Sequence, residues 1–263
     1  MIKILVNGAS GRMGRAMASK ILLEDDMQIV AAVDVKGAGV DIGEATGNPA
    51  IGVIIEDDLE AAIARTKPQV MLDFTNPQAV MKNIRTALSN GVACVVGTTG
   101  LSEADLKEAD DLARANKTPI FAASNFAISA VLMMRFAAEA VKYMPNFEIV
   151  ETHDSHKLDA PSGTAMTTAK MMCANREVFS QESPNSFELL PGCRGGDYQG
   201  ARIHSIRVPG VISLQDCIFG APGQLLTIRA ESTNAECFYP GVAMALRKVL
   251  ELEGLTFGLD KLL

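Results

Sequence analysis

Apolar runs and helical patterns alternate along the first half of the chain. Short apolar runs typical of buried strands cover residues 2–6, 28–33, 70–74, 92–96 and 119–122, with a briefer run at residues 51–55. Helical patterns lie between them, over residues 16–23, after Asp58, over residues 77–90, and from a Ser102–Asp105 capping box to about residue 115. Residues 35–49 are glycine-rich and irregular. Because strands that alternate with helices form a parallel sheet, the pattern predicts a doubly wound α/β domain.

The pattern changes after Phe126. A methionine-rich helix is predicted over residues 129–143, a strand over 148–152, and a helix from Ser162 to about Ala174. Strands over residues 203–208, 211–219 and 224–231 follow with short connections, which predicts an antiparallel meander with one covered face. A helix over residues 237–251 leads to an apolar tail, 255–263, which we expect to dock on the first domain. We therefore expect one domain of residues 1–126 and 238–263, and a smaller α+β domain of residues 127–237 with a mixed or antiparallel sheet.

A glycine-rich turn follows the first strand. Gly8, Gly11 and Gly14 have the spacing G-x-x-G-x-x-G, a variant of the G-x-G-x-x-G fingerprint, and they stand between a strand and a helix as the fingerprint requires. Asp34 ends the next strand, about twenty residues beyond the turn, where an acidic side chain can bond ribose hydroxyls. The alternative is a tight turn that binds no nucleotide. Together the turn and Asp34 favour a Rossmann-like domain that binds NADH or NADPH.

Small polar clusters also follow the other predicted strands of this domain. The carboxyl ends of parallel strands meet at one edge of a sheet, and ligands bind there. Any one cluster alone would be better explained as ordinary turn residues. Because several clusters fall at one predicted edge, we expect the cofactor to be bound by Gly8, Ala9, Ser10, Gly11, Arg12, Met13, Asp34, Lys36, Phe74, Gly97, Thr98, Thr99, Ser124, Asn125 and Phe126.

Charged residues near the turn bear on the choice of cofactor. Asp34 favours NADH, because a carboxylate repels the 2′-phosphate of NADPH. Arg12 in the turn and Lys36, two residues beyond Asp34, could each pair with that phosphate. We therefore expect both NADH and NADPH to be used.

Titratable residues gather between the predicted strand 148–152 and the helix that Ser162 caps. Two of the chain's three histidines, His153 and His156, stand in this connecting loop with Lys157 and Asp159. The amides of Gly163 and Thr164 lie at the start of the helix, a favourable place for a carboxylate or phosphate. The alternative is a polar surface loop before a well-capped helix. Two clustered histidines with a cation and an anion site favour a catalytic loop.

Composition and charge narrow the classes of function. A net charge of −7 and a pI near 5.1 argue against a nucleic-acid surface, which needs clustered Lys and Arg. The five cysteines have no C-x-x-C spacing, so we expect neither a disulfide framework nor a metal site. The longest apolar helix candidate, residues 127–141, is interrupted by Arg135, which argues against a membrane span. A cytoplasmic protein is expected, and His204, within a predicted strand, is interpreted as structural.

Several motifs, taken together, resemble one enzyme family. They are G-x-x-G-R-M-G at residues 8–14, G-T-T-G at 97–100, Asn125-Phe126, R-V-P-G at 207–210 and F-G-A-P-G-Q-L-L-T-I-R at 219–229. Most specific is E-x-H-H-x-x-K-x-D-A-P-S-G-T-A, which covers residues 151–165 with Asp154 in place of the second histidine. Over nearly its whole length the chain resembles the 4-hydroxy-tetrahydrodipicolinate reductases of the diaminopimelate route to lysine.

The resemblance implies a reaction and roles for individual residues. The reaction is the NAD(P)H-dependent reduction of (2S,4S)-4-hydroxy-2,3,4,5-tetrahydrodipicolinate to (S)-2,3,4,5-tetrahydrodipicolinate and water. His153 corresponds to the catalytic acid or base, Lys157 to the proton donor, and Gly163 with Thr164 to a site for a substrate carboxylate. In the family, the histidine that stands at position 154 helps to hold the substrate. Asp154 and His156 complete the substrate site that the resemblance implies. Most members are homotetramers assembled through the second domain, and the resemblance implies the same assembly here.

The chemistry of this reaction fits the residues. Hydride addition to a ring carbon conjugated with an imine builds negative charge that an acid must quench, and His153 or Lys157 can supply the proton. Lys157 and the amides of Gly163 and Thr164 can hold a carboxylate of the dianionic ring. A carboxylate at position 154 would repel that dianion, so we expect Asp154 to face His156 or solvent. Two alternatives remain at this point, a related oxidoreductase on another amino-acid-like substrate and a cofactor-binding redox sensor without turnover.

Overall fold

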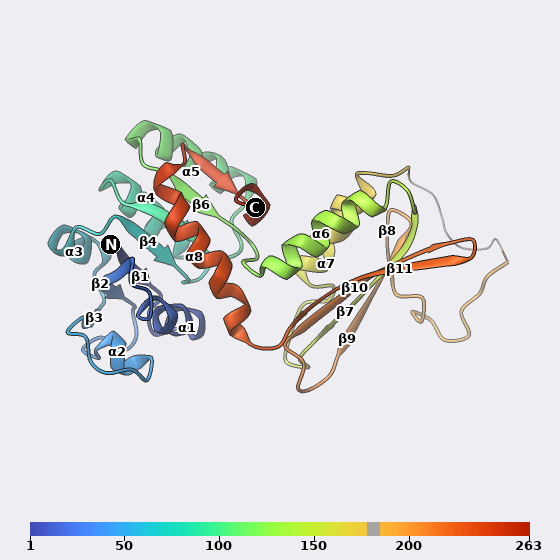
Figure 1. Cartoon of the computed structure of the whole chain (residues 1–263), viewed down its shortest axis with the longest axis horizontal. Helices are drawn as coiled ribbons and strands as arrows, with labels where there is room; N and C mark the ends of the chain where they lie inside the picture. Colours follow the sequence, from blue (N-terminus) through green and yellow to red (C-terminus); the bar gives the residue numbers. More distant parts are fainter. Residues whose placement is uncertain (178–184) are drawn as a thin grey trace. The chain divides into compact units, whose positions relative to one another are not determined.

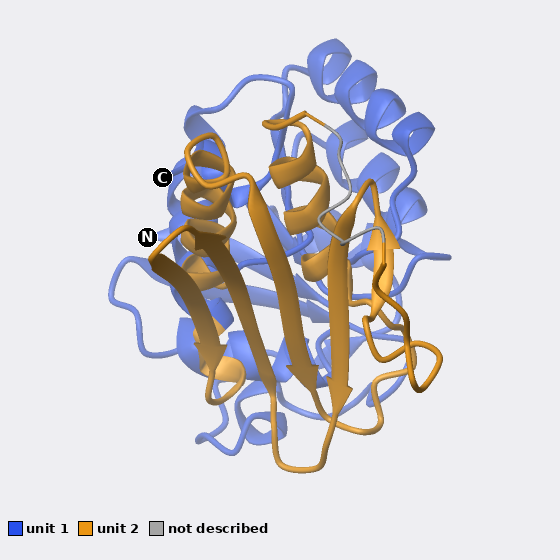
Figure 2. Ribbon diagram, turned by 90° about the vertical axis from the view of Figure 1, so that its right-hand side faces the viewer, with its two compact units in different colours: residues 1–126, 238–263 blue, residues 127–237 orange. Residues whose placement is uncertain are grey.

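The chain folds as two compact units. The structure is a computed structural model that describes residues 1–177 and 185–263. One unit comprises residues 1–126 and 238–263, and the other comprises residues 127–237, drawn in blue and orange in Figure 2. Among the described residues, no helix combines the length and the apolar character needed to cross a lipid bilayer.

The first unit is built on a seven-stranded sheet with the order β12-β6-β5-β4-β1-β2-β3 (Figure 1). All paired strands run parallel, so the predicted doubly wound sheet is confirmed. From β1 the chain builds outwards to β2 and β3 on one side and to β4, β5, β6 and β12 on the other, which puts a topological switch point between β1 and β4. The strands are β1 Ile2–Asn7, β2 Met27–Val33, β3 Ile55–Glu56, β4 Val70–Asp73, β5 Ala93–Val96, β6 Ile120–Ala122 and β12 Leu255–Phe257.

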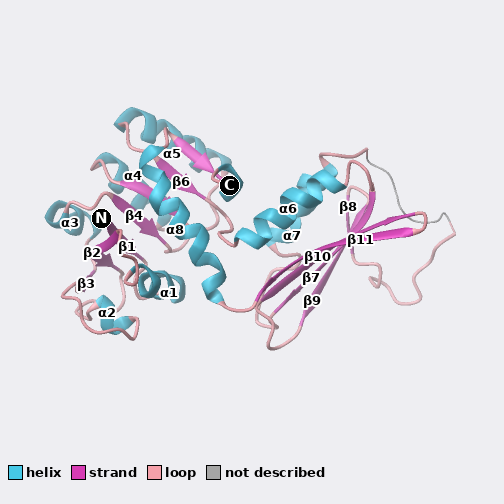
Figure 3. Cartoon of the chain, viewed as in Figure 1, coloured by secondary structure: helices cyan, strands magenta, loops and turns pink. Residues whose placement is uncertain are grey.

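Helices cover both faces of this sheet (Figure 3). On one face, apolar side chains of α3, α4 and α5 pack in a single core with Leu5, Met71 and Cys94 of the strands. On the other face, α1 and α8 contact one another. The capping box at Ser102 is confirmed, since its side chain accepts from Asp105 N and the Asp105 carboxylate accepts in return from Ser102 N. The helices are α1 Arg12–Ile21, α2 Ile42–Ala45, α3 Leu59–Thr66, α4 Val80–Ser89, α5 Glu103–Asn116 and α8 Tyr239–Lys248.

Three details of this unit differ from the prediction. Helix α1 begins at Arg12, directly after the glycine turn, rather than near residue 16. A short helix, α2, interrupts the stretch 35–49 that was predicted to be irregular, and β3 covers only Ile55–Glu56. One side chain accounts for the last two differences, because the buried Asp41 carboxylate caps α2 and also accepts from the amides of Ile51 and Gly52, which holds those residues away from the sheet.

The apolar tail docks on the first unit, as predicted. It adds a strand to the sheet, because Leu255 pairs in parallel with Ile120 of β6. The tail therefore contributes backbone hydrogen bonds as well as apolar contacts.

The second unit contains a five-stranded mixed sheet with the order β11-β10-β7-β9-β8. Its two helices lie on one face of the sheet, as the orange ribbon of Figure 2 shows. On that face Phe147 and Ile149 of β7 are buried, as are Ile203 of β9 and Phe219 of β10. The elements are α6 Ile128–Ala140, β7 Asn146–His153, α7 Gly163–Cys173, β8 Gly196–Tyr198, β9 Ala201–Arg207, β10 Ser213–Ala221 and β11 Gln224–Ser232.

The expectation of an antiparallel meander over residues 203–231 is wrong in one respect. Strands β10 and β11 form the expected hairpin, but β7 stands between β9 and β10, parallel to β9 and antiparallel to β10. Both edges of β7 are therefore paired, and this central strand buries Phe147, Ile149 and Glu151. Leu225, near the tip of the hairpin, lies on the opposite, open face of the sheet and is 79% exposed.

Candidate active site and cofactor pocket

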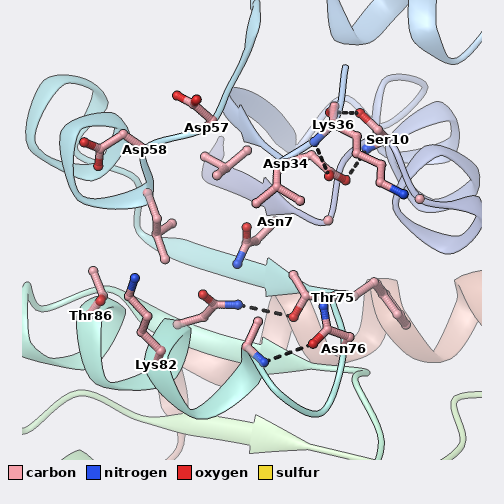
Figure 4. Close-up of a pocket in the computed structure, with 18 of the residues that line it drawn as sticks. Asn7, Ser10, Asp34, Lys36, Asp57, Asp58, Thr75, Asn76, Lys82 and Thr86 are labelled. Carbon is pink, nitrogen blue, oxygen red and sulfur yellow. Dashed lines mark hydrogen bonds between the residues drawn. The ribbon is translucent and has the colours of Figure 1, made fainter. Parts of the chain in front are cut away.

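A pocket of about 1020 Å³ opens at the carboxyl ends of β1, β2 and β4 in the first unit (Figure 4). This is the switch point of the sheet, where doubly wound domains bind ligands. Of the expected cofactor residues, the pocket is lined by Gly8, Ser10, Gly11, Asp34, Lys36 and Phe74. The others that were predicted, which are not part of its lining, are Ala9, Arg12, Met13, Gly97, Thr98, Thr99, Ser124, Asn125 and Phe126.

The glycine turn brings two strand ends into close contact. Gly8 has φ +82°, and a Cβ there would lie 2.4 Å from the carbonyl oxygen of Phe74. A Cβ on Gly14 would lie 2.0 Å from the carbonyl oxygen of Gly8, so this glycine lets α1 start against the turn. Larger residues at either position would push the backbone apart. The helix therefore begins close to the pocket, with its first amides beside the glycine turn.

Backbone amides hold the Asp34 carboxylate at the pocket rim. Its Oδ2 accepts from Ser10 N at 2.9 Å and its Oδ1 accepts from Lys36 N at 2.9 Å, as Figure 4 shows. The Ser10 hydroxyl donates in turn to the carbonyl oxygen of Lys36 at 2.7 Å. Each carboxylate oxygen has a second lone pair, so Asp34 can still accept from a ribose hydroxyl. Arg12, by contrast, is exposed on the first turn of α1.

Asp73 is a buried carboxylate that joins four segments beside the pocket, and sequence reasoning did not select it. Its Oδ2 accepts from the side-chain amides of Asn7 at 2.9 Å and Asn83 at 2.8 Å. Its Oδ1 accepts from the hydroxyls of Thr98 at 2.6 Å and Thr75 at 2.8 Å. Asn7, Thr75 and Asn83 line the pocket, so Thr98 is tied to the pocket wall through Asp73. The available signal was an acid at the end of an otherwise apolar strand.

Aromatic contacts join three more of the predicted cofactor residues. The rings of Phe74 and Phe126 lie 6.1 Å apart between centroids. A Cβ on Gly97 would lie 2.1 Å from Cε1 of the Phe74 ring, so only glycine lets that ring take its place. Thr99 and Ser124 are exposed at the same strand ends. The structure thus brings Phe74, Gly97 and Phe126 together, as their positions at the sheet edge predicted.

In the second unit, His153 is the last residue of β7 rather than a loop residue. The prediction that His153 lies in the loop was wrong. The strand extends one residue past Thr152 because His153 pairs with Arg207 of β9 and Ser213 of β10. Side chains alternate along a strand, so Glu151 and His153 lie on one face. There His153 Nδ1 contacts Glu151 Oε2. The His153 side chain is 15% exposed and that of Glu151 is fully buried.

Glu151 has further partners that sequence reasoning missed. Its Oε1 accepts from the Arg207 guanidinium at 2.8 Å and from Ser162 N at 3.4 Å. Burial acts to raise the pKa of Glu151, but hydrogen bonds from Arg207, Ser205 and His153 outweigh it and hold the pKa below its ordinary value. Glu151 opens the family motif and Arg207 opens the R-V-P-G motif, which were the signals available in the sequence.

The remaining polar residues of the site lie in the loop before α7. Lys157 Nζ donates to Asp159 Oδ1 at 2.7 Å, and the carbonyl oxygen of Asp159 accepts from Arg207 at 2.8 Å. Asp154 Oδ1 accepts from His156 N at 2.9 Å and lies 2.6 Å from His156 Nδ1. These contacts with the backbone and then the ring of His156 lower the pKa of Asp154. Asp154 thus faces His156, the direction expected from charge repulsion.

The predicted N-cap of α7 is confirmed. Ser162 Oγ accepts from Ala165 N at 3.1 Å, and Gly163 and Thr164 are the first two residues of the helix. Gly163 is exposed, and a Cβ there would meet nothing within 4 Å. The start of α7 therefore leaves space for a ligand beside its first turn.

The remaining polar features are possible metal ligands and the third histidine, His204. Among residues 1–177 and 185–263, no group of three or more His, Cys, Asp or Glu side chains is placed to hold a metal ion. His204 Nε2 lies 2.8 Å from Glu148 Oε2, and Glu148 also accepts from Arg194 at 2.5 Å. Neither His204 nor Glu148 makes a hydrogen bond to Glu151 or His153. The interpretation of His204 as a structural residue stays a prediction.

Two family models match the chain. One, described as dihydrodipicolinate reductase, N-terminus, matches residues 2–126, and the other, described as dihydrodipicolinate reductase, C-terminus, matches residues 129–263. The chain belongs to the dihydrodipicolinate reductase family. This confirms the resemblance that the motifs indicated.

Curated relatives and a solved structure agree over the full length of the chain. A 4-hydroxy-tetrahydrodipicolinate reductase of Desulfitobacterium hafniense (strain DSM 10664 / DCB-2) is 48% identical over 100% of this chain and 98% of its own. Another, of Moorella thermoacetica, is 46% identical over the same shares of the two chains. The structure of a dipicolinate-bound dihydrodipicolinate reductase from Paenisporosarcina sp. TG-14 superposes with a TM-score of 0.90, at 41% identity and complete coverage of both chains.

Proposed function

We propose that this chain reduces (2S,4S)-4-hydroxy-2,3,4,5-tetrahydrodipicolinate to (S)-2,3,4,5-tetrahydrodipicolinate and water, with NADH or NADPH as reductant, in lysine and diaminopimelate biosynthesis. The observation that carries the proposal is the group of His153, Glu151, Arg207 and Lys157 at the end of β7, in a family of that activity. The relative described as dipicolinate-bound holds an aromatic dicarboxylate, which is close in shape and charge to the proposed substrate.

The pocket of the first unit fits a dinucleotide. A volume of about 1020 Å³ suits a large ligand, and the glycine turn leaves the backbone of Gly8 to Gly11 open to a pyrophosphate. Ser10 and Lys36 hold Asp34 where it can accept from ribose, and Arg12 and Lys36 offer positive charge to a 2′-phosphate. When bound, the reduced nicotinamide supplies a hydride. The remaining predicted residues lie at the carboxyl ends of the other strands, and we assign them to the cofactor site for that reason. They are Phe74, Gly97, Thr98, Thr99, Ser124, Asn125 and Phe126.

Residues of the second unit would hold the substrate and supply a proton. The Lys157 ammonium and the amides at the start of α7, at Gly163 and Thr164, would bind a carboxylate of the dianionic ring. His153 or Lys157 would give a proton to the ring as negative charge develops on it. Asp154 would stay paired with exposed His156, where its charge opposes the substrate least.

Assembly and location are part of the same proposal. A homotetramer is supported by the family resemblance and by the exposed Ile206 and Leu225, which lie on the sheet face opposite α6 and α7. An assembly that covers this face would bury both side chains. The five cysteines are free thiols, which suits a reducing cytoplasm. Light scattering on the purified chain would test the assembly.

One assay tests the proposed reaction. The purified chain is mixed with the authentic substrate and with NADH or NADPH in turn, and oxidation of the cofactor is followed. We expect oxidation with either cofactor, only when the substrate is present, with release of tetrahydrodipicolinate. Cofactor oxidation without a dependence on this substrate, or with another amino-acid-like substrate alone, would count against the proposal, and binding without turnover would indicate a sensor.

A further inference from the structure

Glu151 is a charged side chain placed where water does not reach. It is fully buried, yet it lies against the proposed catalytic histidine and the guanidinium of Arg207. The Arg207 guanidinium donates to Glu151 Oε1 at 2.8 Å, and a hydrogen bond from a cation favours the ionised form of the carboxyl. An ionised carboxylate has only acceptors to offer.

This decides which nitrogen of His153 carries hydrogen. Nδ1 contacts Glu151 Oε2, and an acceptor-only partner requires an N–H at that nitrogen. In the neutral ring the lone pair then lies on Nε2, and in the charged ring Nε2 bears the proton that can be given away. Nε2 makes no hydrogen bond to the described part of the chain. We propose that Glu151 is a positioning residue that keeps hydrogen on His153 Nδ1 and makes Nε2 the nitrogen that transfers the proton. The inference rests on the proposed function, in which His153 exchanges a proton with the substrate.

The sheet fixes this arrangement without help from the loop. Glu151 and His153 share one face of β7, and Arg207 is the residue of β9 that pairs with His153. The position of the guanidinium therefore follows from strand register. The same NH2 group of Arg207 donates to Glu151 Oε1 and to the carbonyl oxygen of Asp159, both at 2.8 Å. One side chain thus connects the buried carboxylate to the segment that carries Lys157.

A second glutamate on β7, Glu148, contacts an arginine and a histidine in the same way and supplies the control. Glu148 also accepts from an arginine, Arg194, and also lies against a histidine, His204. Its side chain is 30% exposed, and it points to the opposite face of β7. A change at Glu148 removes the same chemical groups from the same strand without touching His153.

The first experiment uses the native chain labelled with ¹⁵N. Imidazole nitrogen spectra distinguish the two neutral tautomers, and His153 is identified by its absence from the spectrum of His153→Asn, which is feasible with three histidines. We expect the neutral ring to carry its hydrogen on Nδ1. A neutral ring with hydrogen on Nε2 would overturn the proposal. This reading needs no substrate, so it stands even if the native chain fails to turn over the proposed substrate.

The second experiment compares Glu151→Gln with Glu148→Gln. In Glu151→Gln the oxygen of the new side-chain amide would accept from Arg207, so the nitrogen of that amide would face His153 Nδ1. A donor at this place requires the lone pair on Nδ1, and the hydrogen of the neutral ring then moves to Nε2. We expect kcat to fall by about 10²–10⁴-fold in that variant, with the Kd of NADH changed by less than about threefold, and little change in Glu148→Gln. A loss under about tenfold, an unchanged tautomer, or an equal loss in Glu148→Gln would each overturn the proposal. The native spectrum decides it where Glu151→Gln does not fold.

Discussion

Asn7 and Asp73 stand opposite one another at the ends of β1 and β4, and the Asn7 side-chain amide donates to Asp73 Oδ2 at 2.9 Å. Thr75, Asn83 and Thr98 also donate to this carboxylate, so all of its acceptors are used by neutral donors. A buried group with this many partners holds the strand ends of the cofactor pocket in one arrangement.

Asp73→Asn should disturb that arrangement while keeping the shape of the side chain. Its NH2 group would face hydrogen-bond donors, which leaves buried donors without an acceptor and costs about 1–3 kcal/mol of unfolding free energy. We expect weaker binding of both NADH and NADPH as well. Urea unfolding and cofactor titration measure the two effects. The control is Asp111→Asn, since Asp111 is 63% exposed and pairs with Lys107 on the surface. Equal stabilities of the two variants would contradict this account of Asp73.

Asp34→Ala should lower kcat/KM with NADH more than kcat/KM with NADPH. The carboxylate is held by Ser10 N and Lys36 N at the pocket rim, where it can bond ribose but repels a 2′-phosphate. The efficiencies kcat/KM with the two cofactors, which should be comparable in the native chain, measure the difference. Asp57→Ala removes another acid from the lining of the same pocket and should affect both cofactors alike. If Asp34→Ala also changed both alike, Asp34 would not bond the ribose.

His153→Ala and Lys157→Ala should each lower turnover by about 10²–10⁴-fold, the usual worth of general acid catalysis. The Kd of NADH should stay nearly the same, because both residues belong to the unit of residues 127–237. Steady-state kinetics with a separate cofactor titration test this. His204→Ala, at the other glutamate-paired histidine, should keep most of its activity. A loss below about tenfold in both variants would refute the assigned roles.

Asp154→Asn should change the Michaelis constant for the substrate little. Asp154 accepts from the backbone of His156 and lies against its ring, and the His156 side chain is 94% exposed. The charge therefore lies on a side chain directed toward a surface residue. A tenfold fall in the Michaelis constant, about 1.4 kcal/mol, would mean that Asp154 opposes the substrate directly. Complete loss of activity would also contradict this expectation and would point to a proton transfer by Asp154.

The contribution of Glu151 to stability should depend on pH. Its pKa in the folded chain is lower than the ordinary 4.5, so folding favours the ionised form. The stabilisation is fully present above the unfolded-state pKa, and it is lost as the pH falls through the lower folded-state pKa. The difference in unfolding free energy between the native chain and Glu151→Gln should therefore shrink as the pH falls below about 4.5. Urea unfolding across this range measures it, and Glu231→Gln, at an exposed acid, should show a smaller change.

Much of the first unit could be predicted because its determinants are local. The apolar runs that became β1, β2 and β4 are short and continuous, as buried parallel strands are. Ser102 and Ser162 cap their helices with side chains that bond amides three residues away, so neighbouring residues sufficed to place those helix starts. The strand predicted over residues 51–55 was too long because the amides of Ile51 and Gly52 donate to the Asp41 carboxylate, ten and eleven residues away, instead of pairing in the sheet.

By itself, the sequence determined the class of the fold, the edge of the sheet where Gly8, Asp34 and Phe74 meet, and the segment that carries His153 and Lys157. These depend on periodicity, glycine spacing and capping, which act over a few residues. Only the tertiary structure decided that β7 lies between β9 and β10, and that Arg207 reaches Glu151 across 56 positions of the chain. The physical reason is that strand order and register follow from which apolar faces can be buried together, and no local pattern records that choice.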